Sequence, residues 1–385
     1  MIIGVPKEIK PDERRVSSTP DTVKKFIADG FEVCVEKGAG EGSFFKDSDY
    51  EQAGAKIADV EKIWASDLVI HVKEPLFNKD KNKHELDMMK RGAYLVTFLH
   101  PSNPAHHGFV RKLADNGITG ITMDSIPRIT RAQVMDPLTS MSTITGYRSM
   151  LIAANLLPKF MPMLTTPVGT IRPSNVLILG VGVVGLQSLA TAKRLGAIVH
   201  AIDIRKDARE QAKSLGAKII DFAPPDDVAA DKSGYAKRLP PEWMEKEKAV
   251  LRSILKDMDI VISSPLIMGE EAPMVITKDM VKLMKPGSVI VDVSVDQGGS
   301  CELTKAAQTI DADGVKVVGT ANIPGAQPVD STRMYAENVY AFIKHMSSGS
   351  GKIKIDMNDD IVGQCVVTSD GKIVHEGTLR AMKAK

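Results

Sequence analysis

A glycine-rich turn between two apolar runs constrains the fold of this chain more than any other feature. The run NVLILG (175–180) opens the spacing G-x-G-x-x-G, which Gly182 and Gly185 complete, and a helical pattern follows it. A second apolar run, AIVHAID (197–203), ends at Asp203. The order strand, glycine turn, helix and strand is typical of the first βαβ unit of a doubly wound parallel sheet.

This arrangement predicts a dinucleotide site. Gly180 permits the tight turn, Gly182 lets the backbone approach a pyrophosphate, and Gly185 lets helix and strand pack closely. The helix N-terminus then favours the anionic phosphates. Asp203 would accept hydrogen bonds from the ribose hydroxyls and repel a 2′-phosphate, which favours NAD(H) over NADP(H). The other residues expected at this site are Val183, Val184, Ile204 and Arg205, and Arg205 tempers the preference for NAD(H). The alternative is a glycine-rich turn that binds no nucleotide.

The rest of the chain repeats the alternation of strand and helix. Its 385 residues correspond to two ordinary domains. Strand-like runs fall at 2–6, 31–38, 68–75, 94–101, 118–124, 259–267, 288–296 and 316–324. Strands separated by helical segments indicate mostly parallel sheets. We therefore predict an α/β fold with two Rossmann-like domains, joined by long helices at 141–157 and 329–346.

One of the two predicted domains consists of two separate segments of the chain, and the other is continuous. Residues 1–138 and 330–385 form a discontinuous α/β domain of the substrate or catalytic type, and residues 139–329 form the NAD(H)-binding Rossmann domain. Residues 223–247 are rich in Pro, Asp and Lys, which predicts a mobile surface loop. The tail 352–375 alternates in the manner of strands around Asp370-Gly371, which predicts a hairpin.

Composition argues against several classes of protein. Lys and Arg total 50 and Asp and Glu total 48, so no charge excess points to nucleic acid. The three cysteines are far apart, which argues against a disulfide framework, and no set of ligands at metal spacing is present. The most apolar stretch, 176–190, is interrupted by glycines and a glutamine, so we expect no membrane span and a cytoplasmic protein.

Several segments, taken together, resemble one family over nearly the whole chain: that of alanine dehydrogenase and the NAD(H)-binding α component of proton-translocating transhydrogenase. The opening GVPKEIKPDERRVSSTPDTV (4–23) is similar to its N-terminal signature, with Arg15 at the arginine position. The resemblance implies an NAD-dependent oxidoreductase with its cofactor in a cleft between two α/β domains. It also implies a homodimer or larger assembly.

Two segments are similar to the transhydrogenase branch. PRITRAQVMDPLTSMSTITGYRSM (127–150) resembles the loop that contacts the nicotinamide end of the cofactor. The functional residues of that loop match Arg128, Gln133 and Asp136, and Thr139 stands where a small hydroxyl residue is usual. SGYAKRL (233–239) resembles the mobile loop of that branch and carries its tyrosine, Tyr235, which is equally consistent with an ordinary exposed loop residue.

Other segments are similar to alanine dehydrogenase. HVKEP places Lys73 at the lysine that holds the substrate carboxylate, TFLHP places His100 at the catalytic histidine, and VSVDQGG places Asp296 at the catalytic aspartate. NIPGAQPVDST, beginning at Asn322, resembles a further segment of that enzyme. Typical transhydrogenase components usually lack this Lys, His and Asp, so this chain departs from both patterns.

The chemistry of an amino-acid dehydrogenase accounts for these residue types. Arg15 suits bidentate capture of a carboxylate, and Lys73 adds a point charge. His100 has the near-neutral pKa that proton transfer to an amine or carbinolamine needs, and Asp296 can orient water or the amine. Each residue also has a simpler interpretation: an Arg15 pair with Glu13, a solvated Lys73, a hydrogen-bonded loop histidine and a turn-forming aspartate.

Three functions stay open on the sequence. The first is a soluble NAD(H)-binding component of a transhydrogenase, which requires partner subunits that carry the NADP site and the membrane channel. The second is a free-standing dehydrogenase that deaminates a small L-amino acid. The third is a regulatory NAD-binding module without turnover. Similarity in 127–150 and in the tail favours the first.

Overall fold

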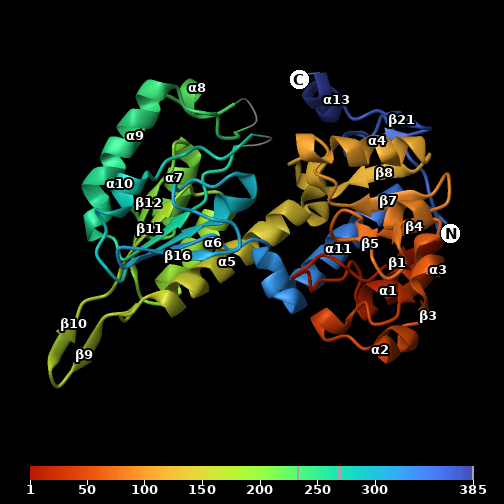
Figure 1. The fold of residues 1–385 in the computed structure, drawn as a ribbon, viewed down its shortest axis with the longest axis horizontal. Coiled ribbons are helices and arrows are strands. Elements are labelled where there is room, and N and C mark those ends of the chain that lie inside the picture. Colours follow the sequence, from red (N-terminus) through yellow and green to blue (C-terminus); the bar gives the residue numbers. More distant parts are fainter. Residues whose placement is uncertain (232–233, 268–269, 384–385) are drawn as a thin grey trace. The chain divides into compact units, whose positions relative to one another are not determined.

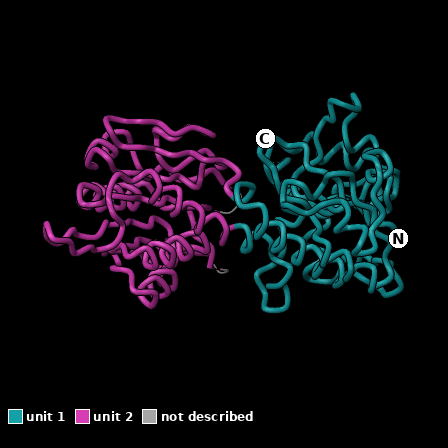
Figure 2. The backbone as a smooth tube through the Cα atoms, turned by 90° about the horizontal axis from the view of Figure 1, so that it is seen from below, with its two compact units in different colours: residues 1–141, 324–385 teal, residues 142–323 magenta. Residues whose placement is uncertain are grey.

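The computed structural model describes residues 1–231, 234–267 and 270–383. The chain divides into two compact units, shown in different colours in Figure 2. Unit 1 comprises residues 1–141 and 324–385, and unit 2 comprises residues 142–323. Helix α5 (Pro137–Leu156) carries the chain from unit 1 into unit 2, and α11 (Pro328–Met346) follows its return. Among the described residues, none of the helices combines the length and the apolar character needed to span a bilayer.

Unit 1 is built on a six-stranded parallel sheet (Figure 1). In spatial order its strands are β3 (Lys56–Ala58), β2 (Glu32–Glu36), β1 (Ile2–Val5), β4 (Leu68–Ile70), β7 (Tyr94–Thr97) and β8 (Thr119–Thr122). Ile3 pairs with Val33 on one side and with Leu68 on the other. The order reverses between β1 and β4, which is the position where open α/β sheets bind ligands.

Helices cover both faces of this sheet, because the side chains of each strand alternate between two buried layers. Ile3, Val5 and Ile70 pack with α1 (Pro20–Ala28) and α11. Val69 and Leu95 pack on the other face with α3 (Val60–Trp64) and α4 (His107–Asp115). Thr19 is the N-cap of α1 and Pro20 is its first residue, a pair that suits the start of a helix.

Unit 2 repeats the strand order of unit 1 and adds one edge strand. Its strands are β13 (Lys218–Ile219), β12 (Ile198–Ile202), β11 (Asn175–Leu179), β14 (Ile260–Ser263), β15 (Val289–Asp292), β17 (Val315–Val318) and the antiparallel β16 (Thr309–Ala312). One face packs on α5, α6 (Val183–Arg194) and α7 (Lys206–Ser214), and the other on α9 (Pro241–Ile254) and α10 (Lys278–Val281). The α/β class with two doubly wound, mostly parallel sheets is thus confirmed.

The smaller elements lie outside the two main sheets. They are the strand pairs β5 (Phe77–Asn78) with β6 (Lys83–His84), β9 (Leu164–Thr166) with β10 (Gly169–Ile171), β18 (Ser347–Gly349) with β19 (Lys352–Ile353) and β20 (Thr368–Ser369) with β21 (Lys372–Ile373), and the helices α2 (Asp47–Gln52), α8 (Asp226–Ala229), α12 (Val362–Cys365) and α13 (Glu376–Lys383). The predicted hairpin forms around Asp370 and Gly371, whose φ angles of 49° and 74° are those of a tight hairpin turn.

The expectation of a loop over 223–247 was wrong for much of the segment. It contains α8, a bridge between Ala230 and Ala236, and the first half of α9. Pro241 stands at the first position of α9, where a missing N–H costs nothing. Proline therefore marks a helix start here and not a break. Lys232 and Ser233, which belong to the same segment, lie outside the described residues.

Candidate functional site

In unit 1 the predicted polar residues follow the strands next to the point where the order reverses. Arg15 lies in the loop after β1, Lys73 follows β4, and His100 follows β7. Because these strands are parallel and adjacent, their carboxyl ends meet at one edge of the sheet. The structure therefore brings Arg15, Lys73 and His100 to the same edge of unit 1, whereas Asp296 belongs to unit 2.

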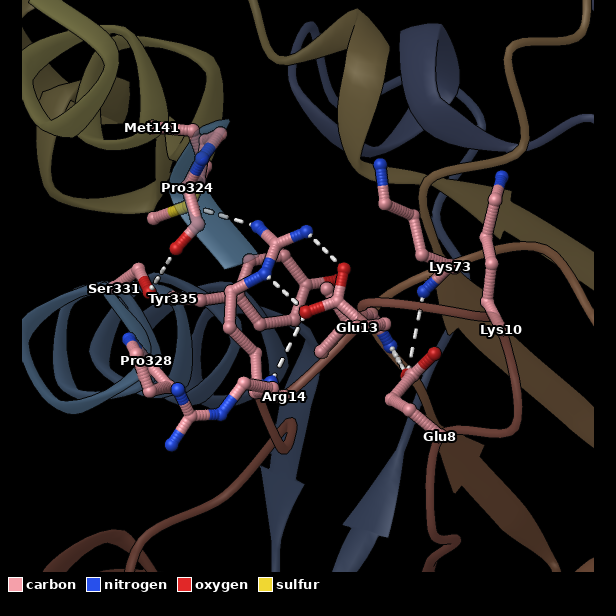
Figure 3. A network of polar contacts seen from close by, with 12 residues as sticks. Glu8, Lys10, Glu13, Arg14, Lys73, Met141, Pro324, Pro328, Ser331 and Tyr335 are labelled. Carbon is pink, nitrogen blue, oxygen red and sulfur yellow. Dashed lines mark hydrogen bonds and ion pairs between the residues drawn. The ribbon is translucent and has the colours of Figure 1, made fainter. Parts of the chain in front are cut away.

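Arg15 forms a buried ion pair with Glu13. Its Nε and Nη2 donate to the two carboxylate oxygens over 2.7 and 2.5 Å, and Nη1 lies 3.0 Å from Sδ of Met141. Arg15 is only 2% exposed. Burial by itself would raise the pKa of Glu13, but the hydrogen bonds and charge of Arg15 lower it to about 2. The Nε–Nη2 edge of the guanidinium, one of its two edges that can bind a carboxylate in a bidentate manner, is thus occupied by Glu13, whose contacts Figure 3 draws as dashed lines.

The backbone of Lys73 is held firmly while its amine extends. The Lys73 N–H donates to Oε1 of Glu8 over 3.3 Å, and its carbonyl accepts from the hydroxyl of Thr97 over 2.8 Å. In Figure 3 the ammonium groups of Lys73 and Lys10 extend in the same direction, away from Glu8. Burial, followed by the charge of Arg15, lowers the pKa of Lys73. An anionic ligand near this amine would therefore stabilise its charged form.

Glu8 and His71 form a buried pair behind Lys73. Oε1 of Glu8 lies 3.1 Å from Nε2 of His71, and it accepts the N–H of Val72 over 2.7 Å. Burial and the neighbouring Glu13 raise the pKa of Glu8 to about 8. Nδ1 of His71 lies 2.7 Å from the carbonyl oxygen of Lys73 and so carries a proton. The sequence did not single out either residue as functional, although each follows a strand next to the reversal point.

His100 is paired with an aspartate that sequence reasoning also missed. Nδ1 of His100 lies 2.8 Å from Oδ1 of Asp124, and the His100 N–H donates to Oδ2 over 2.7 Å. Asp124 lies on a short 3₁₀ turn, η4 (Met123–Ser125), that follows β8, the strand beside the one that leads to His100. A carboxylate at the end of an adjacent predicted strand was the signal that could have identified it.

The 127–136 segment folds as a 3₁₀ turn, η5 (Thr130–Met135), before α5. Arg128 and Gln133 are exposed there. Asp136 acts as a cap: its carboxylate accepts from the N–H and the hydroxyl of Thr139 over 3.1 and 2.6 Å. The loop is anchored from behind, because Nδ2 of Asn338 donates to the carbonyl of Val134 over 2.8 Å.

In unit 2 the glycine turn has the form that a pyrophosphate requires. Gly180 has a φ of 83°, and a Cβ on Gly185 would lie 2.1 Å from the Gly180 carbonyl oxygen. A Cβ on Gly182 would meet only the Nη2 of Arg205, at 3.9 Å. Gly182 is the N-cap of α6 and has no side chain, so no side-chain cap occupies the first N–H groups of the helix. These residues fit an anionic dinucleotide.

Asp203 is saturated by its own surroundings. One carboxylate oxygen accepts the Arg205 N–H and Nε over 2.8 and 3.0 Å, and the other accepts the Val181 N–H and Arg205 Nη2 over 2.6 and 2.9 Å. Arg205 must therefore release Asp203 before ribose hydroxyls can bind it. Glu247 of α9 is a further acid here, unnoticed in the sequence, whose pKa burial and Asp203 raise to about 7.

The remaining predicted residues of unit 2 lie on its connecting segments. Asp296 is exposed on η7 (Val293–Gln297), after β15. The N–H of Tyr235 donates to Asp231 over 2.9 Å, and Asn322 adopts a φ of 49°. Val183 and Val184 begin α6, and Ile204 is half-buried after β12. Within the described residues of the chain, no cluster of three or more His, Cys, Asp or Glu side chains could hold a metal ion.

Comparison with known proteins places this architecture in a family. Residues 4–145 match the N-terminal domain of alanine dehydrogenase/PNT, and residues 149–376 match the C-terminal domain. The chain belongs to the alanine dehydrogenase/PNT family. This is a family of NAD-dependent oxidoreductases. The family resemblance predicted from the sequence is thereby confirmed.

Both branches of the family are represented among the relatives. The chain is 40% identical to the first part of the NAD(P) transhydrogenase subunit alpha of Rhodospirillum rubrum, over 97% of this chain and 98% of that protein. It is 33% identical to alanine dehydrogenase of Staphylococcus saprophyticus, over 99% and 97%. A transhydrogenase structure from Sinorhizobium meliloti matches with a TM-score of 0.85 at 34% identity, covering 97% of this chain and 100% of that one. An L-alanine dehydrogenase structure matches with a TM-score of 0.81 at 28% identity, covering 100% and 99%.

Proposed function

We propose that this chain is the NAD(H)-binding, hydride-transferring component of an NAD(P) transhydrogenase that works with separate partner subunits. The observation that carries the proposal is the 40% identity to the Rhodospirillum rubrum alpha component, which extends over almost the full length of both proteins. The uncapped start of α6 supports it, because its first N–H groups are the kind of donors that a dinucleotide needs.

The residues of unit 2 would hold the cofactor by its phosphates and adenosine. The N-terminus of α6 binds the pyrophosphate, and Gly182 lets the backbone come close to it. Asp203, once released by Arg205, accepts the ribose hydroxyls and disfavours a 2′-phosphate. The nicotinamide ring supplies the hydride at its C4 atom. Weakened discrimination against NADPH in Asp203→Ala would support this assignment, and unchanged affinity for NADH and NADPH would contradict it.

The loop at 127–136 would orient the nicotinamide. Hydride transfer between two nicotinamides needs alignment of the reacting carbons at about 3–3.5 Å and no proton donor. Exposed polar side chains on an anchored loop suit that task, and Arg128 and Gln133 meet this description. Asp136 contributes by capping α5 and thereby fixing where the loop ends.

The partners follow from the proposed reaction. An NADP-binding subunit would receive the hydride, and membrane subunits would hold this chain at the cytoplasmic face of the inner membrane. We also propose a homodimer. The β9–β10 hairpin and the segment that leads to it expose apolar side chains at Val168 (93%), Met163 (63%) and Phe160 (55%), which a second copy of the chain could cover. Sedimentation of wild type and Val168→Asp tests this, and a monomeric wild type would contradict it.

The decisive experiment is transfer to a partner. Purified chain is combined with membranes that contain the NADP-binding subunit, and reduction of an NADP⁺ analogue by NADH is followed optically. Gln133→Ala should lower the transfer rate about tenfold or more while the NADH dissociation constant changes less than about threefold. Gln52→Ala, an exposed glutamine on α2, is the matched control. Equal losses in binding and transfer would contradict a role of this loop in hydride transfer.

A second function is favoured by one observation, the His100–Asp124 pair beside the amine of Lys73. These groups suit a dehydrogenase that acts on a small L-amino acid, although the Arg15–Glu13 pair leaves less room for carboxylate capture. NADH formation by the chain alone, with NAD⁺ and small L-amino acids at alkaline pH, would establish it if His100→Ala abolishes turnover. No turnover with intact NADH binding leaves the transhydrogenase component.

A further inference from the structure

The pairing of His100 with Asp124 goes beyond what hydride transfer between nicotinamides requires, because that reaction moves no proton at a side chain. The ring and the backbone of His100 both bind one carboxylate: Nδ1 lies 2.8 Å from Oδ1, and the N–H donates to Oδ2 over 2.7 Å. Asp124 is held in turn by the hydroxyl of Thr122, which donates to Oδ2 over 2.6 Å. This carboxylate therefore fixes both the place and the orientation of the imidazole.

The backbone of His100 supports the same conclusion independently. His100 has a φ of 45°, in the left-handed region that a residue with a Cβ seldom adopts. Such a conformation persists only where surrounding contacts hold it, and it is frequent at functional sites. The hydrogen bond from the His100 N–H to Asp124 is one contact that does so.

We propose that Asp124 is the positioning residue of His100, which holds the proton on Nδ1 and leaves Nε2 as the atom that exchanges a proton with the amine or carbonyl group of a small carboxylic acid. The proton exchange at Nε2 rests on the second function proposed above. The position of the proton on Nδ1 does not depend on that function. In the neutral form, Nδ1–H donates to Asp124 and Nε2 is a base. In the charged form, Nε2–H is the acid.

The electrostatics of the site agree with this assignment. Burial opposes a charged ring, but the charge and hydrogen bond of Asp124 outweigh it, so the pKa of His100 is raised. Lys73 and Glu74, which follow β4, act on the ring with opposite signs, and the ring of His106 lies 5.8 Å away. On the other side, Asp124 faces three further titratable groups of the C-terminal segment, Tyr335, Cys365 and His375.

Nuclear magnetic resonance of the imidazole nitrogens tests the proposal without any turnover. In the wild type, we expect Nδ1 to be protonated in the neutral form and the pKa to lie above its ordinary value of about 6.5. The spectrum of His100→Gln assigns the signal. In Asp124→Asn, the side-chain amide can donate to Nδ1, so the proton should move to Nε2 and the pKa should fall by about one pH unit or more. Asp87→Asn, an exposed carboxylate paired with Lys112, is the matched control.

The outcomes separate this inference from the proposed function. A wild-type ring that is protonated on Nε2 in its neutral form, or an Asp124→Asn ring with an unchanged pKa, would overturn it, and the first result does not depend on any Asp124 variant. Asp124→Glu should restore some of the raised pKa, which a purely structural defect would not show. If the chain also turns over an amino acid, the acidic limb of its kcat/KM profile should shift with the pKa of His100. Absence of turnover with the expected ring behaviour refutes the dehydrogenase and leaves the role of Asp124 intact.

Discussion

The two units share one strand order but treat the connection after their first strand in opposite ways. In unit 2, three residues (180–182) separate β11 from α6, and the N-terminus of α6 has no side-chain cap. In unit 1, fourteen residues (6–19) separate β1 from α1, and Thr19 and Thr22 cap the helix reciprocally. In α1 the capping box satisfies the Thr19 and Thr22 N–H groups and Pro20 has no N–H, so this N-terminus offers a phosphate fewer donors than that of α6. The same topology thus supports a dinucleotide site in one unit and a polar loop in the other.

Each unit also has an ion pair near this connection, and the pair in unit 1 is more deeply buried than the pair in unit 2. Glu13 and Arg15 have side-chain exposures of 0% and 2%, whereas Asp203 and Arg205 have 4% and 22%. Arg205 can therefore turn towards solvent or a ligand, but Arg15 cannot leave Glu13 without a buried charge remaining. The two residues of each pair are equally close in sequence. The difference in burial therefore decides which ion pair can separate.

Removal of the Glu13 charge should have the largest effect. Glu13→Gln removes the carboxylate charge that binds the buried Arg15 guanidinium, which we expect to lower the free energy of unfolding of unit 1 by about 3–5 kcal/mol. Asp203→Asn, the matched change in unit 2, should cost about 1–2 kcal/mol, because Arg205 can reach solvent. Urea unfolding followed by Trp64 in a Trp243→Phe background, and by Trp243 in a Trp64→Phe background, measures each unit separately.

The contribution of Glu13 to the stability of unit 1 should also depend on pH. The pKa of Glu13 is lowered to about 2 in the folded chain, so its contribution to stability is present above its unfolded pKa of about 4.5 and is lost as the pH falls through 2. The unfolding free energies of wild type and Glu13→Gln should therefore converge towards the acid end of this range. A constant difference between pH 7 and pH 3 that persists to pH 2 would contradict the assignment.

A methyl group on the phosphate turn should have an intermediate effect. Gly182→Ala fills the space in front of α6 without a steric clash, so NADH affinity should fall about tenfold or more, equal to about 1.4 kcal/mol, with the free energy of unfolding changed by less than about 0.5 kcal/mol. Titration calorimetry with NADH and urea unfolding measure the two quantities. Gly108→Ala on α4, where a Cβ meets nothing within 4 Å, should leave NADH affinity unchanged.

Removal of the cap in unit 1 should have the smallest effect. Thr19→Ala breaks the hydrogen bond that the Thr19 hydroxyl accepts from the Thr22 N–H over 3.2 Å, which should cost about 1 kcal/mol of the stability of unit 1. NADH binding should not change, because α1 offers no phosphate site. A loss of NADH affinity in Thr19→Ala would contradict the division of roles between the two helix N-termini.

Local patterns predicted the regions of the fold that depend on neighbouring residues. The βαβ unit around Gly180 and the hairpin at Asp370-Gly371 both formed as expected, because turns and amphipathic periods act over a few residues. The short β3 and the edge strand β16 were missed. Their identity as strands comes from pairing with β2 and β17, which no local pattern contains.

The candidate site shows the same limit more clearly. Residue types and motif matches singled out Lys73, His100 and Asp203. The carboxylates that hold the first two, Glu8 at the backbone of Lys73 and Asp124 beside His100, lie 65 and 24 residues away in sequence. Whether Arg15 pairs with Glu13 or stays available was undecided from the sequence, because both interpretations use the same residues.

By itself, the sequence determined the α/β class, the glycine turn and the family, since these depend on short spacings and on similarity along the chain. Only the tertiary structure decided which charges are neutralised and which remain available. Parallel strands bring distant strand ends to one edge, and burial there makes an unpaired charge costly. The buried Arg15 is therefore bound to Glu13, while Lys73 and the His100–Asp124 pair keep the capacity to meet a ligand.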